Sequence, residues 1–214
     1  VPSGLLRRLL EGEIDVALCP VADYQTSPEA LRILPAGGIG CDGAALTVRL
    51  FSRVRPERIE ELAADVDSHT SVVLAQLVLA RRYGARPNVV PHDVRAPDVA
   101  RRAEGLLLIG DKVITDPPSR AEFPFDLDLG VEWKRLTGRP FVFAVWTARA
   151  AQPLAGLQEV LARQREANRL RLEEIASAHG PRLGWPQELA LRYLTEFMRY
   201  ETGPAELEAI ETFW

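Results

Sequence analysis

Cysteine, histidine and long apolar runs are all scarce in this chain of 214 residues. The two cysteines, Cys19 and Cys41, are too few for a disulfide framework, so a reducing cytoplasm is the expected compartment. The three histidines show no His/Cys ligand spacing, which argues against a structural metal. No stretch approaches the roughly 20 consecutive apolar residues of a membrane-spanning helix, so we expect no membrane partner.

The sequence also lacks a basic stripe and a nucleotide-binding motif. Its 26 basic residues are outnumbered by 30 acidic ones, the net charge is -4, and acids are interleaved with bases in runs such as RQREANRLRLEE. These runs indicate solvated helix faces rather than a nucleic-acid surface. No GxGxxG follows a strand and no P-loop occurs, which argues against dinucleotide and nucleotide binding.

The order of the predicted elements indicates an α/β protein. Short strand-like runs alternate with helical runs up to about residue 147, and from Pro153 onward only helices are predicted. The predicted helices before residue 147 include 68–84, which ends at Gly84, 96–105, and 126–138, which ends at Gly138. The predicted strands at 47–53 and 141–147 bracket a self-contained block, which indicates two lobes joined by a two-strand hinge. We therefore expect a ligand cleft between two lobes. The expected lobe boundaries are 1–52 plus 148–214 for the first lobe and 53–147 for the second.

The stretch PAGGIGCDGAALTVRLFSR, residues 35–53, is unusually rich in small residues. A plain connection needs one glycine, but this segment holds Gly37, Gly38, Gly40 and Gly43. Such a backbone takes unusual dihedral angles or lets a ligand or neighbouring backbone approach closely. If the hinge strand begins at Thr47, the glycines before it line the cleft and offer their N–H groups to a substrate.

A predicted helix that begins near Ser68 is the second candidate site. Its first turn holds Ser68, His69, Thr70 and Ser71. A helix N-terminus attracts anions through its N–H groups and partial positive charge, and the hydroxyls would add donors to a carboxylate. A well-capped helix, however, needs only one of these hydroxyls. His69 is either a proton carrier or an ordinary surface or core residue.

The Gly110–Asp111 pair and Cys41 each have both a functional and a structural interpretation. Gly110 and Asp111 follow the buried run LLLI, and ligands of α/β proteins bind at such strand ends. Asp111 is equally suited to cap a helix or turn. Cys41 would be a nucleophile only with a stabilised thiolate, and no Cys/His/Asp arrangement accompanies it, so the alternative is a small packing residue.

Five segments occur in register along the chain: GEIDVALCPVADY, GIGCDGAALTVRLFS, HTSVVLAQLVL, LLLIGDKVI and DLGVEWKRLTGRPFVFAVW. Together they resemble the chorismate dehydratase family of the futalosine route to menaquinone. Each segment is weak alone, but five in order are specific. The resemblance covers most of the chain and becomes looser in the helical tail.

The resemblance implies a type 2 periplasmic-binding-protein fold, with two α/β lobes, a two-strand hinge and a helical C-terminal tail. It implies that water is removed from chorismate to give 3-[(1-carboxyvinyl)oxy]benzoate, without a metal or organic cofactor. Thr47 is the expected catalytic residue. The expected substrate-binding residues are Gly40, Cys41, Asp42, Gly43, Ser68, His69, Thr70, Ser71, Gly110 and Asp111.

The chain departs from the family pattern at three places. The family usually has a serine where Thr47 stands, and threonine keeps the hydroxyl. Cys41 replaces the usual serine after Gly40. The family begins with a strand and a loop that contains a Tyr-Leu-Asn-x-x-Pro run, whose Asn faces the substrate. This run does not occur here, so we expect the N-terminal part of the first lobe to precede Val1.

Two other functions are compatible with the same fold. A sister enzyme converts cyclic dehypoxanthine futalosine to dihydroxynaphthoate and shares the DLG…TG helix, but GIGCDGAALTVRLFS and FVFAVW favour the dehydratase. A non-catalytic solute-binding protein is the other alternative, because this fold most often only binds. A homodimer is permitted by apolar tail residues expected to be exposed: Leu194, Phe197, Phe213 and Trp214.

Overall fold

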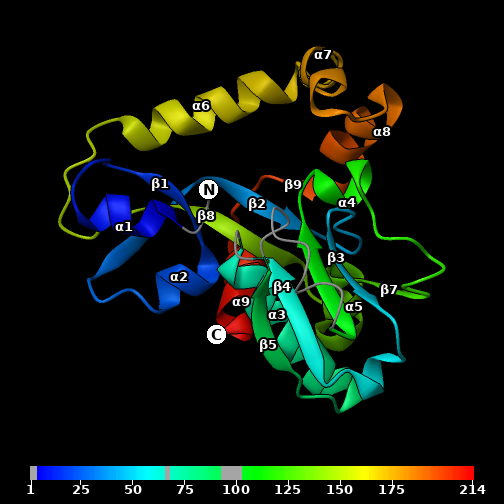
Figure 1. Ribbon diagram of the computed structural model, residues 1–214. Coiled ribbons are helices and arrows are strands. Elements are labelled where there is room, and N and C mark those ends of the chain that lie inside the picture. The colour runs from blue at the N-terminus through cyan, green and yellow to red at the C-terminus, as the bar shows by residue number, and fades with distance from the viewer. Residues whose placement is uncertain (1–3, 66–67, 93–102) are drawn as a thin grey trace. The chain divides into compact units, whose positions relative to one another are not determined.

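The computed structural model describes residues 4–65, 68–92 and 103–214. The chain forms two compact units (Figure 1). The first unit comprises Val1–Asp42 and Arg139–Trp214, and the second is the block Gly43–Gly138. Among the described helices, none combines the length and apolar character that crossing a membrane requires.

The first unit is built on an antiparallel sheet with strand order β1-β8-β2-β9. β2 pairs with β8 from Leu31 opposite Arg149 to Cys41 opposite Phe141. Helix α6 packs along β2 and helix α9 packs against β8, as Figure 1 shows. The α-helices and strands of this unit are α1 (Leu5–Leu10), β1 (Ala17–Pro20), α2 (Val21–Gln25), β2 (Leu31–Cys41), β8 (Phe141–Arg149), α6 (Leu157–Arg169), α7 (Leu172–His179), α8 (Gln187–Arg192), β9 (Met198–Arg199) and α9 (Pro204–Phe213).

Aromatic contacts fix the C-terminal helix α9 to this sheet. Phe213 packs edge-on against Phe141, with 5.1 Å between the ring centroids. Trp214 stacks on Tyr24 at 5.2 Å and donates a hydrogen bond from Nε1 to the Val21 carbonyl. Phe213 is therefore buried, and the expectation that it forms part of an exposed dimerisation surface is wrong.

The second unit is built on a mixed sheet with strand order β5-β4-β6-β3-β7. β4, β5 and β6 are parallel, whereas β3 runs antiparallel to both β6 and β7. Helices α3 and α5 pack against each other. The α-helices and strands are β3 (Val48–Ser52), β4 (Glu61–Asp65), α3 (His69–Val78), β5 (Asn88–His92), β6 (Gly105–Ile109), α4 (Lys112–Thr115), β7 (Phe125–Asp128) and α5 (Leu129–Thr137).

The ends of the two long helices of this unit follow the predicted stop signals. α3 continues through a wider turn at Leu79–Tyr83 and ends at Gly84, whose φ is +70°. α5 ends at Gly138 with φ +73°. Both glycines adopt the left-handed conformation that closes helices, which side chains disfavour. The sequence therefore located these helix ends correctly.

Two segments that were expected to be helical form strands instead. The first three residues of the helix expected at 126–138 belong to β7 (Phe125–Asp128). This strand pairs with β3, and Arg49 and Asp126 make a two-point ion pair across the two strands. Met198–Arg199 forms β9 and pairs with the end of β2. In both places, pairing with a neighbouring strand prevails over local helix preference. Most of the helix expected at 96–105 lies outside the described residues.

The boundaries of the two units differ from the expected 52/53 and 147/148. β3 belongs to the second unit because its hydrogen-bonded neighbours are β6 and β7. β8 belongs to the first unit because it lies between β1 and β2. The chain therefore changes unit after Asp42 and again after Gly138, before each of these strands begins.

The glycine-rich segment is mostly strand, and neighbouring backbone explains its small residues. A Cβ added to Gly40 would lie 2.6 Å from the Phe141 carbonyl oxygen, and one on Gly38 would lie 2.7 Å from that of Ala144. These separations are shorter than any real Cβ contact, so only glycine fits. The expectation of a glycine loop is corrected for Gly37, Gly38 and Gly40, which lie within β2.

We expect Gly40→Ala to destabilise the protein by roughly 1–3 kcal/mol, because the added methyl group overpacks the β2–β8 ladder. Gly4→Ala is the control, since no atom lies within 4 Å of its added Cβ, and its effect should stay within about 0.5 kcal/mol. Denaturant unfolding of both variants measures the difference. Equal stabilities would contradict the steric explanation of this glycine.

Candidate functional site

Polar residues gather at one end of the sheet in the second unit. The parallel strands β4 and β6 end there, and the antiparallel strand β3 begins there. The Gly110 N–H donates to the Thr47 carbonyl over 2.8 Å, which joins the end of β6 to the start of β3. The sheet-end cluster comprises Thr47, Asp65, Ser68, His69, Thr70, Ser71, Gly110, Asp111 and Lys112.

An ion pair with a buried carboxylate lies in this cluster. Asp65, at the end of β4, is 1% exposed and pairs with the Lys112 ammonium group. Its Oδ2 also accepts a hydrogen bond from the Ile109 N–H at 3.4 Å. Neither residue was predicted from the sequence, although an aspartate at the end of a short strand and the lysine of the GDK segment could have identified them.

Ser68 serves as the N-cap of α3. Its Oγ accepts from the Ser71 N–H at 3.2 Å and donates to the Ser71 hydroxyl at 2.8 Å. The capping interpretation is therefore confirmed for Ser68. Thr70 and Ser71 are buried and His69 is exposed. The N-terminus of this ten-residue helix carries the partial positive charge that favours an anion.

Thr47 follows a strained turn immediately before β3. The Thr47 N–H donates to the Ala45 carbonyl at 2.7 Å, and Leu46 between them has a φ of +64°. This combination is typical of a γ-turn with positive φ, which is rare for a bulky residue. Thr47 itself is 4% exposed. The predicted catalytic residue therefore directly follows a residue in an unusual backbone conformation.

The Asp128 carboxylate holds this turn. Its Oδ1 accepts from the Ala45 N–H at 2.9 Å, and its Oδ2 accepts from the Leu46 N–H at 2.8 Å. The same Oδ1 caps α5 by accepting from the N–H groups of Gly130 and Val131. From the sequence, Asp128 was expected to lie in a helix, and no role was predicted for it.

The remaining predicted residues occupy different surroundings. Gly40 and Cys41 pair with β8 and β9, and Cys41 is completely buried. The backbone of β2 therefore does not form the expected binding loop there. Asp42 is exposed, and Gly43 has a φ of +108° with open space around it. Asp111 is exposed and makes no side-chain hydrogen bond that caps α4, so the alternative that its side chain caps a helix is not supported.

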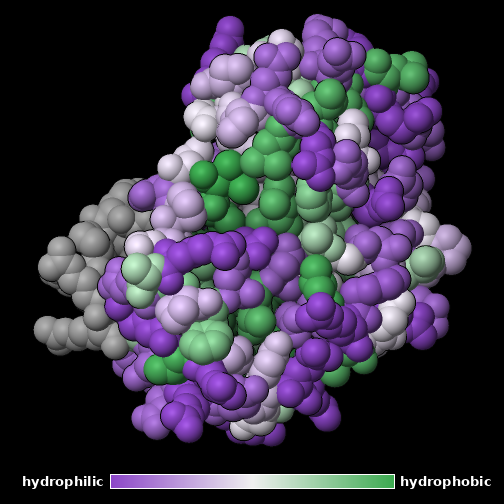
Figure 2. Space-filling view, turned by 90° about the vertical axis from the view of Figure 1, so that its right-hand side faces the viewer, coloured by the Kyte–Doolittle hydropathy of each residue, from purple (hydrophilic) through white to green (hydrophobic). Residues whose placement is uncertain are grey.

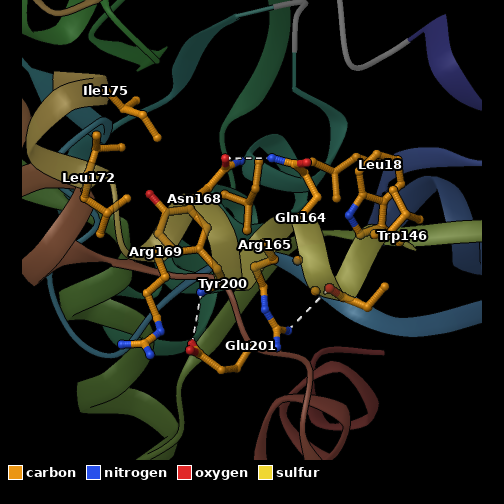
Figure 3. Close-up of a pocket in the computed structure, with 16 residues that line it drawn as sticks. Leu18, Trp146, Gln164, Arg165, Asn168, Arg169, Leu172, Ile175, Tyr200 and Glu201 are labelled. Atoms are coloured by element: carbon orange, nitrogen blue, oxygen red, sulfur yellow. Dashed lines mark hydrogen bonds between the residues drawn. The ribbon is translucent and has the colours of Figure 1, made fainter. Parts of the chain in front are cut away.

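A cavity of about 370 Å³ lies within the first unit, between the sheet and α6 and α7. Figure 3 shows Tyr200 in its centre, Trp146 and Leu18 on one side, and Leu172 and Ile175 on the other. Figure 2 shows a band of hydrophobic residues in the middle to upper part of one face, framed by hydrophilic side chains. Gly37 and Gly38 contribute to the cavity wall.

The polar groups of this cavity come mainly from α6. Arg165 donates from Nη1 to the Ala36 carbonyl at 3.3 Å, and Gln164 donates to Asn168 at 2.9 Å (Figure 3). The Arg165 Nε is buried without a hydrogen-bond partner among the described residues. A flat, largely apolar molecule with an acceptor group would match this lining. This cavity was not predicted from the sequence.

The family profile described as "Menaquinone biosynthesis" matches residues 1–214. Chorismate dehydratase of Thermus thermophilus is 31% identical over 222 residues, which cover 97% of this chain and 81% of that protein. The chain belongs to the menaquinone biosynthesis family. It is a homologue of chorismate dehydratase, as the sequence resemblance indicated.

Solved structures similar to this family member confirm the fold class. Protein AF1704 from Archaeoglobus fulgidus has a TM-score of 0.73 at 16% identity, with 100% of this chain and 81% of that protein covered. The alkanesulfonate-binding protein SsuA from Xanthomonas axonopodis pv. citri has a TM-score of 0.61 at 14% identity, covering 100% and 76%. The α/β fold of periplasmic solute-binding proteins is therefore confirmed.

No metal-binding chemistry emerges from the parts of this family member that the structure describes. Residues 4–65, 68–92 and 103–214 contain no group of three or more His, Cys, Asp or Glu side chains placed to hold a metal ion.

Burial, aided by the Asp23 charge, raises the pKa of the Cys19 thiol to about 11. Burial also raises the pKa of Tyr200 in the first-unit cavity. Both groups are therefore neutral at physiological pH.

We expect both cysteines to resist alkylation in the folded protein, because each is 0% exposed and only the thiolate reacts. Mass spectrometry after iodoacetamide treatment at pH 8, with and without denaturant, measures this. The unfolded chain should take up two labels and the native chain none. Rapid labelling of native Cys41 would contradict its burial and restore it as a group that a substrate can reach.

Proposed function

We propose that this chain is a chorismate dehydratase, a hydro-lyase that converts chorismate to 3-[(1-carboxyvinyl)oxy]benzoate. The observation that carries the proposal is the sheet-end cluster, where a buried Thr47 lies at the start of β3 and Gly110 at the end of β6. The name of the Thermus thermophilus relative supports the same reaction. Chorismate has two carboxylates, which suit a helix N-terminus and an ammonium group.

The reaction needs little chemical help from a protein. One ring C–H bond and the neighbouring C–O bond break, and the electron pair of the C–H bond becomes the third double bond of an aromatic ring. The proton and the hydroxyl leave together as water, so no oxidant or reductant is required. Because aromatisation drives the reaction, the protein's main contributions are orientation and exclusion of solvent.

The residues of the cluster take distinct roles in this proposal. The N-terminus of α3 and Lys112 bind the substrate carboxylates. The Thr47 hydroxyl hydrogen-bonds the ring hydroxyl that leaves, and the backbone of Gly43 and Gly110 lies against the substrate. His69 and Asp111 are the exposed groups of the cluster that can exchange a proton with solvent. A substrate carboxylate is the alternative proton acceptor.

A cytoplasmic location is part of this proposal. Neither Cys19 nor Cys41 is part of a disulfide, and cysteines in the thiol form are characteristic of reducing compartments. The reaction as written needs no partner besides the small-molecule substrate.

The direct test is to incubate the protein with chorismate, without added cofactor, and to follow the products by chromatography and mass spectrometry. We expect a product that is lighter by one water and that retains the enolpyruvyl group. Binding of chorismate without turnover would contradict the proposal and favour a solute-binding role. Turnover of cyclic dehypoxanthine futalosine instead would favour the sister enzyme.

We expect Thr47→Val to lower kcat roughly 10²-fold, because valine is nearly isosteric and removes only the hydroxyl. Thr47→Ser is the matched control, since it keeps the hydroxyl and should retain most of the activity. Steady-state kinetics with chorismate measure both variants. Full activity in Thr47→Val would exclude Thr47 as the catalytic residue.

A further inference from the structure

The turn before Thr47 has an unfavourable conformational free energy. A φ of +64° at Leu46 brings its Cβ against the backbone, and such conformations cost on the order of 1–3 kcal/mol. They persist only where surrounding contacts impose them, and they concentrate at functional sites. The contacts that impose this one come from the Asp128 side chain, which lies more than 80 residues away along the chain.

The Asp128 side chain is held in place from two further directions. It is 8% exposed, and its Oδ1 is fixed by the first N–H groups of α5, at 3.0 Å from Gly130 and 3.2 Å from Val131. Arg49 lies 3.7 Å from Oδ2, while its own guanidinium is engaged by Asp126 at 2.7 and 2.8 Å. The carboxylate is therefore a rigid anchor, and hydrogen bonds to a charged acceptor are the stronger kind.

We propose that Asp128 is a positioning residue, whose carboxylate holds the Ala45–Thr47 turn and thereby fixes the Thr47 hydroxyl for the reaction. This inference rests on the proposed function of Thr47. Helix α5 thus contributes to the site through its N-cap rather than through a substrate contact. A displacement of about 1 Å at a reacting group can lower a rate roughly 10²-fold, so the anchor matters even though it touches no substrate.

Asp128→Asn tests the anchor with little change in shape. An amide oxygen can still cap α5 and accept from Ala45, but the amide nitrogen then faces the Leu46 N–H as a second donor. We expect kcat to fall at least about 10-fold, with KM changed less than about 3-fold. Asp126→Asn is the matched control, because it weakens the neighbouring ion pair with Arg49 but leaves the turn's hydrogen bonds intact. Its kcat should stay within about 2-fold of the wild type.

A double-mutant cycle separates positioning from a general structural role. If Asp128 acts through Thr47, adding Asp128→Asn to Thr47→Val should lower kcat less than about 2-fold further. If the kcat losses of the two single variants instead multiply in the double variant, the inference is overturned. If Asp128→Asn does not fold, Asp128→Ser replaces it in the cycle, because serine is a good N-cap but lacks the second carboxylate oxygen.

Hydrogen exchange distinguishes failure of this inference from failure of the proposed function. Asp128→Asn should accelerate amide exchange across residues 43–48 relative to Asp126→Asn, whether or not chorismate is turned over. Unchanged exchange would overturn the anchor, even in an active enzyme. A wild-type protein that is inactive with chorismate but shows the accelerated exchange in the variant would instead refute the dehydratase assignment and leave the anchoring of the turn supported.

Discussion

The arrangement of the second unit at its sheet end depends on one buried carboxylate. Asp128 ends β7, caps α5 and accepts two hydrogen bonds from the turn that leads into β3. Four backbone N–H groups from two separate segments therefore converge on one side chain. A charged acceptor satisfies such groups better than a neutral one, and it stabilises a backbone conformation that Leu46 alone would avoid.

This anchor connects fold and function. β3 occupies the position between β6 and β7, so its first residues lie where the parallel strands β4 and β6 end. Ligands of α/β proteins commonly bind at that edge of a sheet. The Asp65–Lys112 ion pair and the N-terminus of α3 supply charged and polar groups at the same edge. Membership of the menaquinone biosynthesis family gives this arrangement a chemical context.

The sequence predicted features that rest on local chemistry. Gly84 and Gly138 end helices, and Ser68 begins one, because their conformations and caps depend on a few adjacent residues. It failed where distant strands decide the structure. β7 and β9 exist because β3 and β2 offer hydrogen-bonding edges, and the glycines of β2 reflect the approach of β8.

The candidate site likewise contains residues that the local sequence predicts and residues that only distant contacts bring into place. Thr47 could be predicted from its place in a sequence motif, and Ser68 from its place at the start of a helix. Asp128 could not, because its partners lie more than 80 residues earlier and only the folded sheet brings them together.

Amide hydrogen exchange with and without chorismate tests most directly where the substrate binds. We predict protection at residues 45–47, 68–71 and 109–112. Protection confined to Gly37–Ile39 and α6, around the cavity of the first unit, would contradict this account.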